Sequence, residues 1–303
     1  MKKIPCNFCG SNNCKFLFHG QDRSFKNDDG QLFDVVKCEN CGLAYLNPQP
    51  TKEELKKYYT EDYDQYGGGA IFKYGPLSRP IKFFLDRFKK RRPVLKNDQP
   101  NLAESAINYL DFGCGGGINL EEQRKKHPTW HLYGLDIIDI ACLKTRQRGF
   151  EVFCGDINEL EMPENFFDAV NMSHVIEHLN DPKAALLKIN RMLKKGGKLT
   201  IALPNFDSLA AKLFKKYWYG LDAPRHLYFF TPKTVALLLK QTGFSAKKIS
   251  YAPGPLVEIL SLYYWLGKKD RRISPIIWRM FLPLGFILFK LKKTSIMTID
   301  AVK

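Results

Sequence analysis

The stretch Tyr109-Leu-Asp-Phe-Gly-Cys-Gly-Gly-Gly117 joins an apolar strand end to a turn dense in glycine. The next residues, Ile118-Asn-Leu-Glu-Glu122, open a predicted helix. A strand, a glycine-rich turn and a helix in this order bring the backbone of an α/β sheet close to a nucleotide. The sequence therefore predicts a nucleotide-binding α/β domain built around this turn.

Four more strands are predicted downstream, at 132–136, 153–156, 167–174 and 194–203. Two of them end on an acid, Asp136 and Asp156. Asp136 follows the glycine turn by about 20 residues, the usual distance for an acid that holds ribose hydroxyls. A helix over 232–243 and a strand over 244–252 complete the expected core, which spans residues 106–255. The pattern predicts a Rossmann-like fold with a mostly parallel sheet.

The spacing of the glycines restricts the nucleotide. A dinucleotide fingerprint requires glycine at the first, third and sixth places of G-x-G-x-x-G. Counted from Gly113, the sixth place is Ile118, so the pyrophosphate fingerprint fails. Asp111, just before the turn, suits a cationic ligand better than two phosphates.

The order Asp111-x-Gly-x-Gly-x-Gly, then Asp136, then Gly155-Asp156, resembles class I S-adenosylmethionine-dependent methyltransferases. The resemblance implies that the glycine turn lies under the methionine part of the cofactor. It also implies that Asp136 takes the ribose diol and that Asp156 lies by the adenine amine. The expected cofactor-binding residues are Asp111, Gly113, Gly115, Gly117, Asp136, Asp156, Ile157 and His174.

Two C-x-x-C pairs near the N-terminus, Cys6/Cys9 and Cys38/Cys41, are each followed by glycine. Glycine tolerates a left-handed turn that lets backbone amides point at thiolate sulfur. Four thiolates satisfy a closed, structural zinc site, and a hairpin over 16–36 fits between the pairs. Residues 1–46 are therefore predicted to form a zinc ribbon, with Cys14 as an alternative ligand.

The start of the chain, Met1 to Cys6, lacks the apolar region of a signal peptide, which favours a cytoplasmic protein. Cysteines of a cytoplasmic protein are expected to stay reduced. Cys114, Cys142 and Cys154 are accordingly interpreted as core or loop thiols.

Residues 47–105 are expected to connect the ribbon to the core. Thr51 and Glu54 have the spacing of a capping box and predict a helix start. The aromatic, glycine-ended segment 58–69 is interpreted as a lid that closes over a ligand. Residues 80–92 predict a basic amphipathic helix and 96–104 a polar linker.

Histidines on the acceptor side of the fold are the candidate catalytic groups: His226, His178 and His174. His174 and His178 follow the fourth strand and are expected one helical turn apart on one face. Histidine often acts as the base near neutral pH. The alternative is that His174 contacts the adenine or methionine edge of the cofactor, while Glu177 and His178 hold the loop.

The ribbon, His174-Val-Ile-Glu-His178 and the stretch from Trp218 to Leu227 together resemble bacterial methyltransferases that carry an N-terminal zinc-binding domain. This group is tied to cell-surface polysaccharide and sugar modification. The resemblance implies a sugar or a glycan/lipid-linked acceptor. A quinone-like small molecule is the next alternative, and a noncatalytic zinc- and nucleotide-binding module is the non-enzyme alternative.

RNA is the third acceptor, because a net charge of +16 attracts polyanions. It is less favoured, since Asn171-Met-Ser-His174 replaces the Asn/Asp-Pro-Pro-aromatic cluster frequent in methyltransferases that modify base amino groups.

Residues 256–303 are predicted to be a basic amphipathic C-terminal segment. The apolar run from Ile276 to Phe289 is interrupted by Arg279 and Pro283 and is shorter than the ~20 residues of a transmembrane helix. Basic residues flank it at 268–272 and 290–293, which favours peripheral contact at the inner face of the membrane through 276–293, with Trp278 inserted. The alternative is a helix packed on the core.

Overall fold

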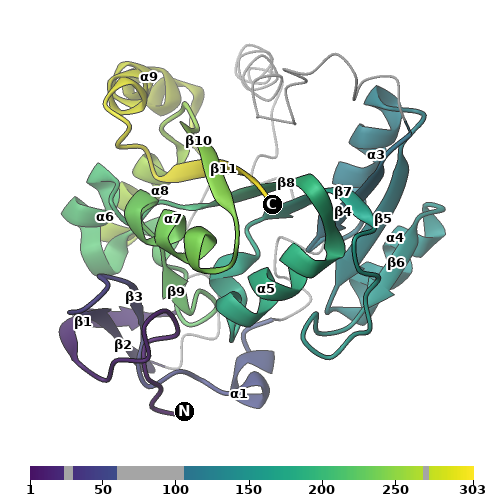
Figure 1. Ribbon diagram of the computed structural model, residues 1–303. Helices are drawn as coiled ribbons and strands as arrows, with labels where there is room; N and C mark the ends of the chain where they lie inside the picture. Colours follow the sequence, from purple (N-terminus) through teal and green to yellow (C-terminus); the bar gives the residue numbers. More distant parts are fainter. Residues whose placement is uncertain (24–29, 60–105, 269–272) are drawn as a thin grey trace.

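The computed structural model describes residues 1–23, 30–59, 106–268 and 273–303. Its larger sheet has seven strands in the order β10-β11-β8-β7-β4-β5-β6 (Figure 1). The bounds of these strands are β4 (Asn108–Phe112), β5 (His131–Asp136), β6 (Glu151–Cys154), β7 (Phe167–Ser173), β8 (Leu193–Pro204), β10 (Ser245–Tyr251) and β11 (Ile296–Val302). The strands from β6 to β8 pair in parallel, and β11 runs antiparallel to both its neighbours. The predicted Rossmann-like, mostly parallel sheet is confirmed.

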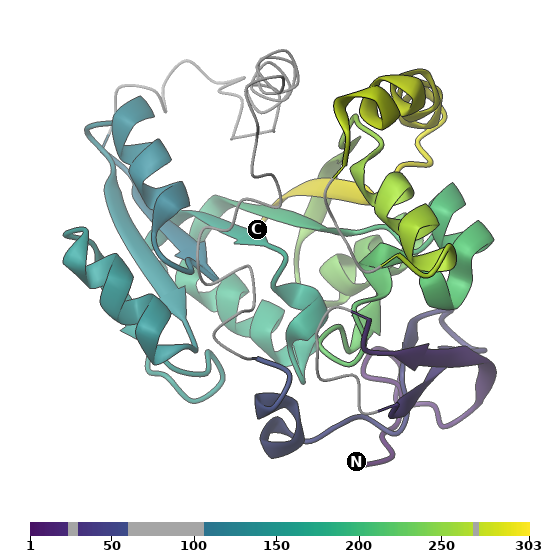
Figure 2. The ribbon, with the colours of Figure 1, turned by 180° about the vertical axis from the view of Figure 1, so that it is seen from behind.

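Helices connect the parallel strands, because such connections must cross from one end of the sheet to the other. Figure 2 shows α3 (Ile118–Lys126) and α4 (Asp139–Gln147) beside β5 and β6. α5 (Pro182–Met192) and α7 (Pro232–Gln241) have proline in the first turn and a side-chain cap, from Asp181 and Thr231. α5 and α7 each bury an apolar stripe, such as Ala185, Leu186 and Ile189 of α5.

A smaller sheet at the N-terminus has the order β1-β2-β3-β9. β1 (Cys14–Gln21) and β2 (Leu32–Cys38) form the predicted hairpin, β3 (Ala44–Leu46) follows, and β9 (Tyr228–Phe229) comes from the far part of the chain. Thr51 and Glu54 form the expected capping box of α1 (Lys52–Lys56). The expected lid over 58–69 lies outside the described residues from residue 60 onward, as do the expected helix over 80–92 and linker over 96–104.

One hydrophobic core joins the two sheets. Phe8 of the N-terminal segment packs on Phe230 with ring centroids 6.0 Å apart, and Tyr45 stacks near Tyr228 at 6.4 Å. All four side chains are buried. The N-terminal sheet therefore loses part of its core if it is separated from the rest of the chain.

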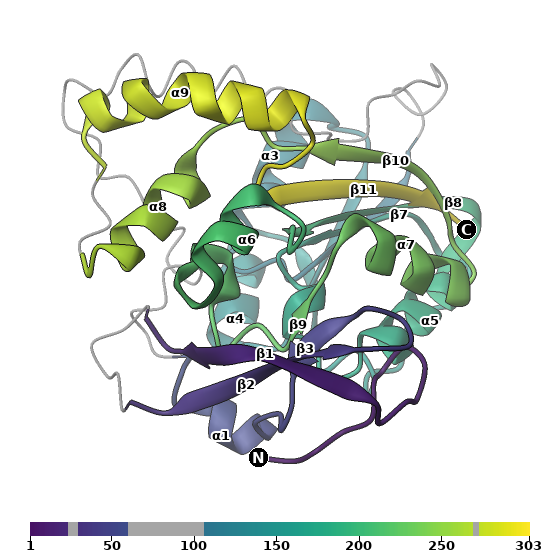
Figure 3. The same ribbon diagram turned by 90° about the vertical axis from the view of Figure 1, so that its left-hand side faces the viewer.

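The C-terminal residues differ from the expectation. α8 (Leu256–Trp265) and α9 (Pro275–Lys290) lie at the opposite end of the molecule from the N-terminal sheet (Figure 3), but β11 lies inside the main sheet, between β8 and β10. The expectation that 256–303 is one separate segment is therefore wrong. Alternate residues of β11, Met297, Ile299 and Ala301, are buried, and this pattern secures its place.

Trp278 does not face outward, as a residue inserted in a membrane would. It is 2% exposed and packs in a small cluster with Ile259 and Tyr263 of α8. With Phe281 and Leu282 of α9, which pack against the same cluster, it holds α9 on α8. Among the described residues, no helix is both long enough and apolar enough to cross a membrane.

Candidate functional site

The glycine turn between β4 and α3 has the backbone that the sequence predicts. Gly113, Gly115 and Gly117 have φ of +75°, +52° and +79°, a region that favours glycine. A Cβ atom on Gly113 would lie 2.2 Å from Cγ2 of Val175, so a larger residue cannot fit there. The turn is therefore packed closely against the loop after β7.

Asp111 lies near the carboxyl end of β4 and is buried. Its Oδ1 accepts a hydrogen bond from Nδ2 of Asn171, at 2.9 Å. Burial raises the pKa of Asp111 to about 6. A buried carboxylate without a cationic partner among the described residues suits a positively charged ligand.

Asp136, at the end of β5, holds the glycine turn in place. Its two oxygens accept hydrogen bonds from the backbone N–H of Gly115 at 2.8 Å and of Ile138 at 3.0 Å. Burial raises its pKa above the usual value. Each carboxylate oxygen has two acceptor sites, so both can also accept a hydrogen bond from a ligand hydroxyl.

Asp156 follows β6, and Ile157 beside it is buried. Nζ of Lys52, from α1, lies 2.7 Å from Oδ2 of Asp156. Burial acts to raise the pKa of Asp156, but the hydrogen bonds from Lys52 and Asn158, together with the charge of Lys52, outweigh burial and the pKa is lowered. The sequence offered no signal for Lys52, because it lies 104 residues away along the chain.

His174 does not belong to a helix with His178, so the expectation that they share a helical face is wrong. His174 has a φ of +56°, and only Ile176–His178 form a turn of 3-10 helix (η3). The backbone N–H of His174 donates to the carbonyl of Ala202 at 2.8 Å, which holds this unusual conformation. Its side chain is 36% exposed, and its Nδ1 lies 3.2 Å from Oε1 of Glu177.

His178 and His226 come together from segments far apart in sequence, with ring centroids 4.6 Å apart. Nδ1 of His178 lies 3.1 Å from the carbonyl oxygen of Arg225, and Nδ1 of His226 lies 3.0 Å from that of Gly220. Nε2 of His226 is 4.0 Å from Oε1 of Glu177 and 3.9 Å from Oδ2 of Asp222. We call Glu177, His178, Asp222 and His226 the acid–imidazole cluster.

Arg225 connects this cluster to the N-terminal sheet. Its buried guanidinium donates to both oxygens of Asp22, at 2.9 and 3.0 Å, and to Oδ1 of Asp222 at 2.6 Å. Sequence reasoning missed this pair of carboxylates. The close spacing of Asp222, Arg225 and His226, unusual for a buried loop, was the signal that could have found it.

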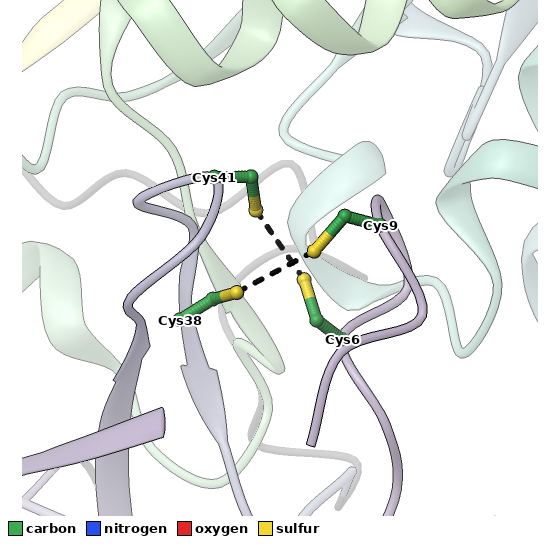
Figure 4. A group of neighbouring side chains, drawn as sticks. All are labelled: Cys6, Cys9, Cys38 and Cys41. Carbon is green, nitrogen blue, oxygen red and sulfur yellow. Dashed lines mark hydrogen bonds between the residues drawn. The ribbon is translucent and has the colours of Figure 1, made fainter. Parts of the chain in front are cut away.

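The four cysteines of the two C-x-x-C pairs converge, as Figure 4 shows. Sγ of Cys6 lies 3.4 Å from that of Cys41, and Sγ of Cys9 lies 3.5 Å from that of Cys38. Gly10 and Gly42 have φ of +70° and +79°, as expected of the residue after each pair. Cys14 is not a member of the group.

The expectation that Cys142 and Cys154 are free thiols is wrong. They form a disulfide that joins α4 to the end of β6, with Cα atoms 6.0 Å apart. The two residues face each other because α4 packs on β6, a contact that spacing along the chain does not reveal. Cys114 is a buried free thiol, as expected.

Comparison with known proteins matches residues 74–248 to a family described as "Methyltransferase domain". The chain belongs to the S-adenosylmethionine-dependent methyltransferases. The buried Asp111, the turn with four glycines and the acids at neighbouring strand ends fit this cofactor.

Several proteins are similar to this methyltransferase over part of its length. The ubiquinone biosynthesis O-methyltransferase of Coxiella burnetii is 27% identical over 188 residues, which cover 60% of this chain and 72% of the relative. An uncharacterized 37.1 kDa transposon protein of Streptomyces fradiae is 33% identical over 113 residues, 35% of this chain and 33% of that protein. The chain thus matches only a third of the length of the Streptomyces relative.

A crystal structure of a SAM-dependent methyltransferase from Archaeoglobus fulgidus shares the fold, with a TM-score of 0.50 and 21% identity, covering 80% of this chain and 98% of that one. At this identity the likeness shows the fold alone.

Proposed function

We propose that this methyltransferase methylates a hydroxyl oxygen of an acceptor bound beside His174, at the carboxyl ends of β7 and β8. The observation that carries the proposal is the position of a His174–Glu177 pair next to the strand ends that hold Asp111 and Asp136. S-adenosylmethionine supplies an activated methyl group as a sulfonium. The chain must then position the acceptor and receive its proton.

The residues around the glycine turn are proposed to hold the cofactor. Asp136 accepts hydrogen bonds from the ribose hydroxyls, and Asp156 lies at the adenine amine with Ile157 as an apolar neighbour. Gly113, Gly115 and Gly117 leave room for the methionine part. The negative charge of Asp111 favours the cationic part of the cofactor over a neutral product.

Among the three candidate histidines, the geometry favours His174 as the base. Its side chain is 36% exposed, whereas His226 is buried and the ring Nε2 of His178 is shielded from solvent. With Glu177 accepting from Nδ1, the lone pair of Nε2 is available to the hydroxyl proton. His178 and His226 are proposed to shape the acceptor side instead.

Two acceptor classes satisfy this geometry. A sugar or lipid-linked glycan is supported by the resemblance to methyltransferases that carry a zinc-binding domain. A phenol of the quinone-precursor type is supported by the 27% identity to the Coxiella enzyme. Both present a hydroxyl whose proton must leave during transfer.

The test is incubation of the full chain with methyl-labelled cofactor and three acceptors: a quinone-precursor phenol, a lipid-linked sugar and RNA. We expect label in an alkali-stable methyl ether of one of the first two. Asp136→Ala is the matched control and should abolish labelling without unfolding the chain. Label found in RNA would reject both proposed acceptor classes, and label found in a methylamine would overturn the proposal of O-methylation.

We also propose that Cys6, Cys9, Cys38 and Cys41 bind one structural zinc ion. Zn–S bonds of 2.3 Å in a tetrahedron place neighbouring sulfurs about 3.8 Å apart. The sulfur separations of 3.4 and 3.5 Å are close to this value. Four thiolates leave no open position, so the zinc would take no part in methyl transfer.

Finally, we propose that α9 rests on the surface of an anionic membrane, which would place the chain near lipid-linked acceptors. Five large apolar residues on and just after α9 are between 53% and 71% exposed: Ile276, Met280, Phe286, Ile287 and Leu291. Arg279, Lys290 and Lys292 lie among them, and basic side chains add ~1 kcal/mol each near anionic headgroups.

Sedimentation with vesicles tests the membrane proposal. The full chain should bind vesicles of anionic lipid and not vesicles of neutral lipid, and Met280→Ser/Phe286→Ser should bind less. Leu187→Ser, an exposed leucine on α5, is the matched control and should bind as the unchanged chain does. If all three proteins bind anionic vesicles equally, or if none of them binds, the membrane proposal is rejected.

A further inference from the structure

The acid–imidazole cluster collects electron-pair donors that face one another. A carbonyl oxygen only accepts, so the contacts with Arg225 and Gly220 favour a proton on Nδ1 of both histidines. The hydroxyl oxygen of Tyr59, 3.1 Å from Nδ1 of His178, then accepts from the same N–H. Each neutral ring then has its lone pair on Nε2. Nε2 of His226 directs that lone pair toward carboxylate oxygens of Glu177 and Asp222, at 4.0 and 3.9 Å.

Two of the inward-facing atoms are left without a partner. Nε2 of His178 and Oε2 of Glu177 are buried and have no hydrogen-bond partner among the described residues. Glu177 is 1% exposed. Burying such a group unpaired costs about 1–3 kcal/mol, and more when it is charged. A cation at the centre would satisfy both of these atoms at once, while Asp222 keeps its hydrogen bonds from Arg225.

We propose that Glu177, His178 and His226 bind a divalent first-row transition-metal ion, with Asp222 as a fourth ligand. Ligand atoms of the first three lie within 4.8 Å of one another. Bonds of about 2.1 Å place opposite ligands about 4.2 Å apart and adjacent ones about 3 Å apart, so small side-chain movements close the site.

The surroundings of the cluster match those of a metal site. Metal-binding histidines usually donate their other ring N–H to a carbonyl or a carboxylate, which orients the ring. Arg225 O and Gly220 O supply this contact here. Two imidazoles and two carboxylates suit ions of manganese, iron, cobalt or zinc. The four cysteine thiolates instead select softer metal ions.

The ion would act by position. It would tie Asp222 and His226, in the loop after η5 (Tyr219–Leu221), to Glu177 and His178, in the turn after β7. His174, which contacts Glu177, lies directly beside this link. The metal site rests on the proposed function only for its effect on methyl transfer, since binding of the ion is a property of the four side chains.

Manganese is the probe, because Mn²⁺ prefers oxygen and imidazole ligands to thiolates. We would titrate the whole 303-residue chain, without removing any zinc held by the four cysteines, and count bound Mn²⁺ by electron paramagnetic resonance. The unchanged chain should bind one Mn²⁺, and His178→Ala/His226→Ala should lose it. His131→Ala, which removes an exposed histidine, should keep it.

A second measurement covers the case in which the double variant does not fold. Mn²⁺ should raise the melting temperature of the unchanged chain, because a ligand that binds the folded state stabilises it. No bound Mn²⁺ and no thermal shift in the unchanged chain would overturn the inference and leave a proton to balance the carboxylates. One Mn²⁺ bound by a chain that methylates no hydroxyl would instead defeat the proposed function and leave the metal site standing.

Discussion

The four-cysteine group and the acid–imidazole cluster are both sets of four side chains that converge on a point, but the chain builds them differently. Each C-x-x-C pair forms within one tight turn, closed by a hydrogen bond such as Gly42 N–H to Cys38 O at 3.0 Å. The acid–imidazole cluster needs Glu177 and His226 to meet. They become neighbours only after β7, η5 and the buried Arg225 are in place. Local turns can be recognised in a sequence, whereas a meeting of distant segments cannot.

The largest expected effect is on the first group. Cys38→Ser should abolish stoichiometric zinc and unfold the N-terminal sheet, because structural zinc binding is worth about 10–16 kcal/mol in zinc-finger peptides. Cys14→Ser, outside the group, should retain both zinc and stability. Metal analysis and thermal melting give the readout. Zinc-free protein that melts like the zinc-loaded form would show that the turns alone hold this region.

The next effect is on the link between the two regions. Arg225→Met leaves Asp22 and Asp222 buried without their cation, and breaking a buried pair in this way costs about 3–5 kcal/mol. Arg148→Met, which removes an exposed pair with Glu121, should cost about 1 kcal/mol or less. Urea unfolding measures both. Equal costs would mean that Arg225 does not hold the second cluster together.

Asp111, beside the glycine turn and away from both clusters, predicts how the stability of the chain depends on pH. Its pKa is raised from 3.8 to about 6 by burial, so the folded chain binds its proton more tightly than the unfolded chain. Stability should therefore fall as pH rises from 4 to 7, by roughly 3 kcal/mol for a shift of this size. Asp111→Asn should lack this part of the slope. Urea unfolding at several pH values compares the two, and parallel slopes would contradict the expectation.

The smallest expected effect is on affinity for the cofactor product, and it distinguishes the residues around the glycine turn from the acid–imidazole cluster. Asp136→Asn should weaken binding of S-adenosylhomocysteine about 10- to 100-fold, since hydrogen bonds to a charged group contribute about 1.5–3 kcal/mol. His178→Ala should change this affinity little, because His178 contacts the loop at 225 rather than the glycine turn. Calorimetry decides. A large loss with His178→Ala would place the second cluster inside the cofactor site.

Much of the fold was accessible to prediction from patterns that act over a few residues. Strands β4, β5, β7 and β8 lie where apolar runs place them, and the capping box at Thr51 forms as its spacing predicts. The place of β11 between β8 and β10 was not accessible, because an alternating pattern does not record which strands will flank it. The Cys142–Cys154 disulfide was missed for a related reason, since it depends on how α4 packs against β6.

Residue order alone therefore specified the glycine turn, the acids at the strand ends and the two cysteine turns. Each is local, because backbone conformation and hydrogen bonds between near neighbours create it. Packing of the whole chain specified the partners of those groups: Lys52 at Asp156, Arg225 between Asp22 and Asp222, and His226 beside Glu177. These contacts join segments that hydrophobic burial brings together, and no spacing along the chain records which segments will meet.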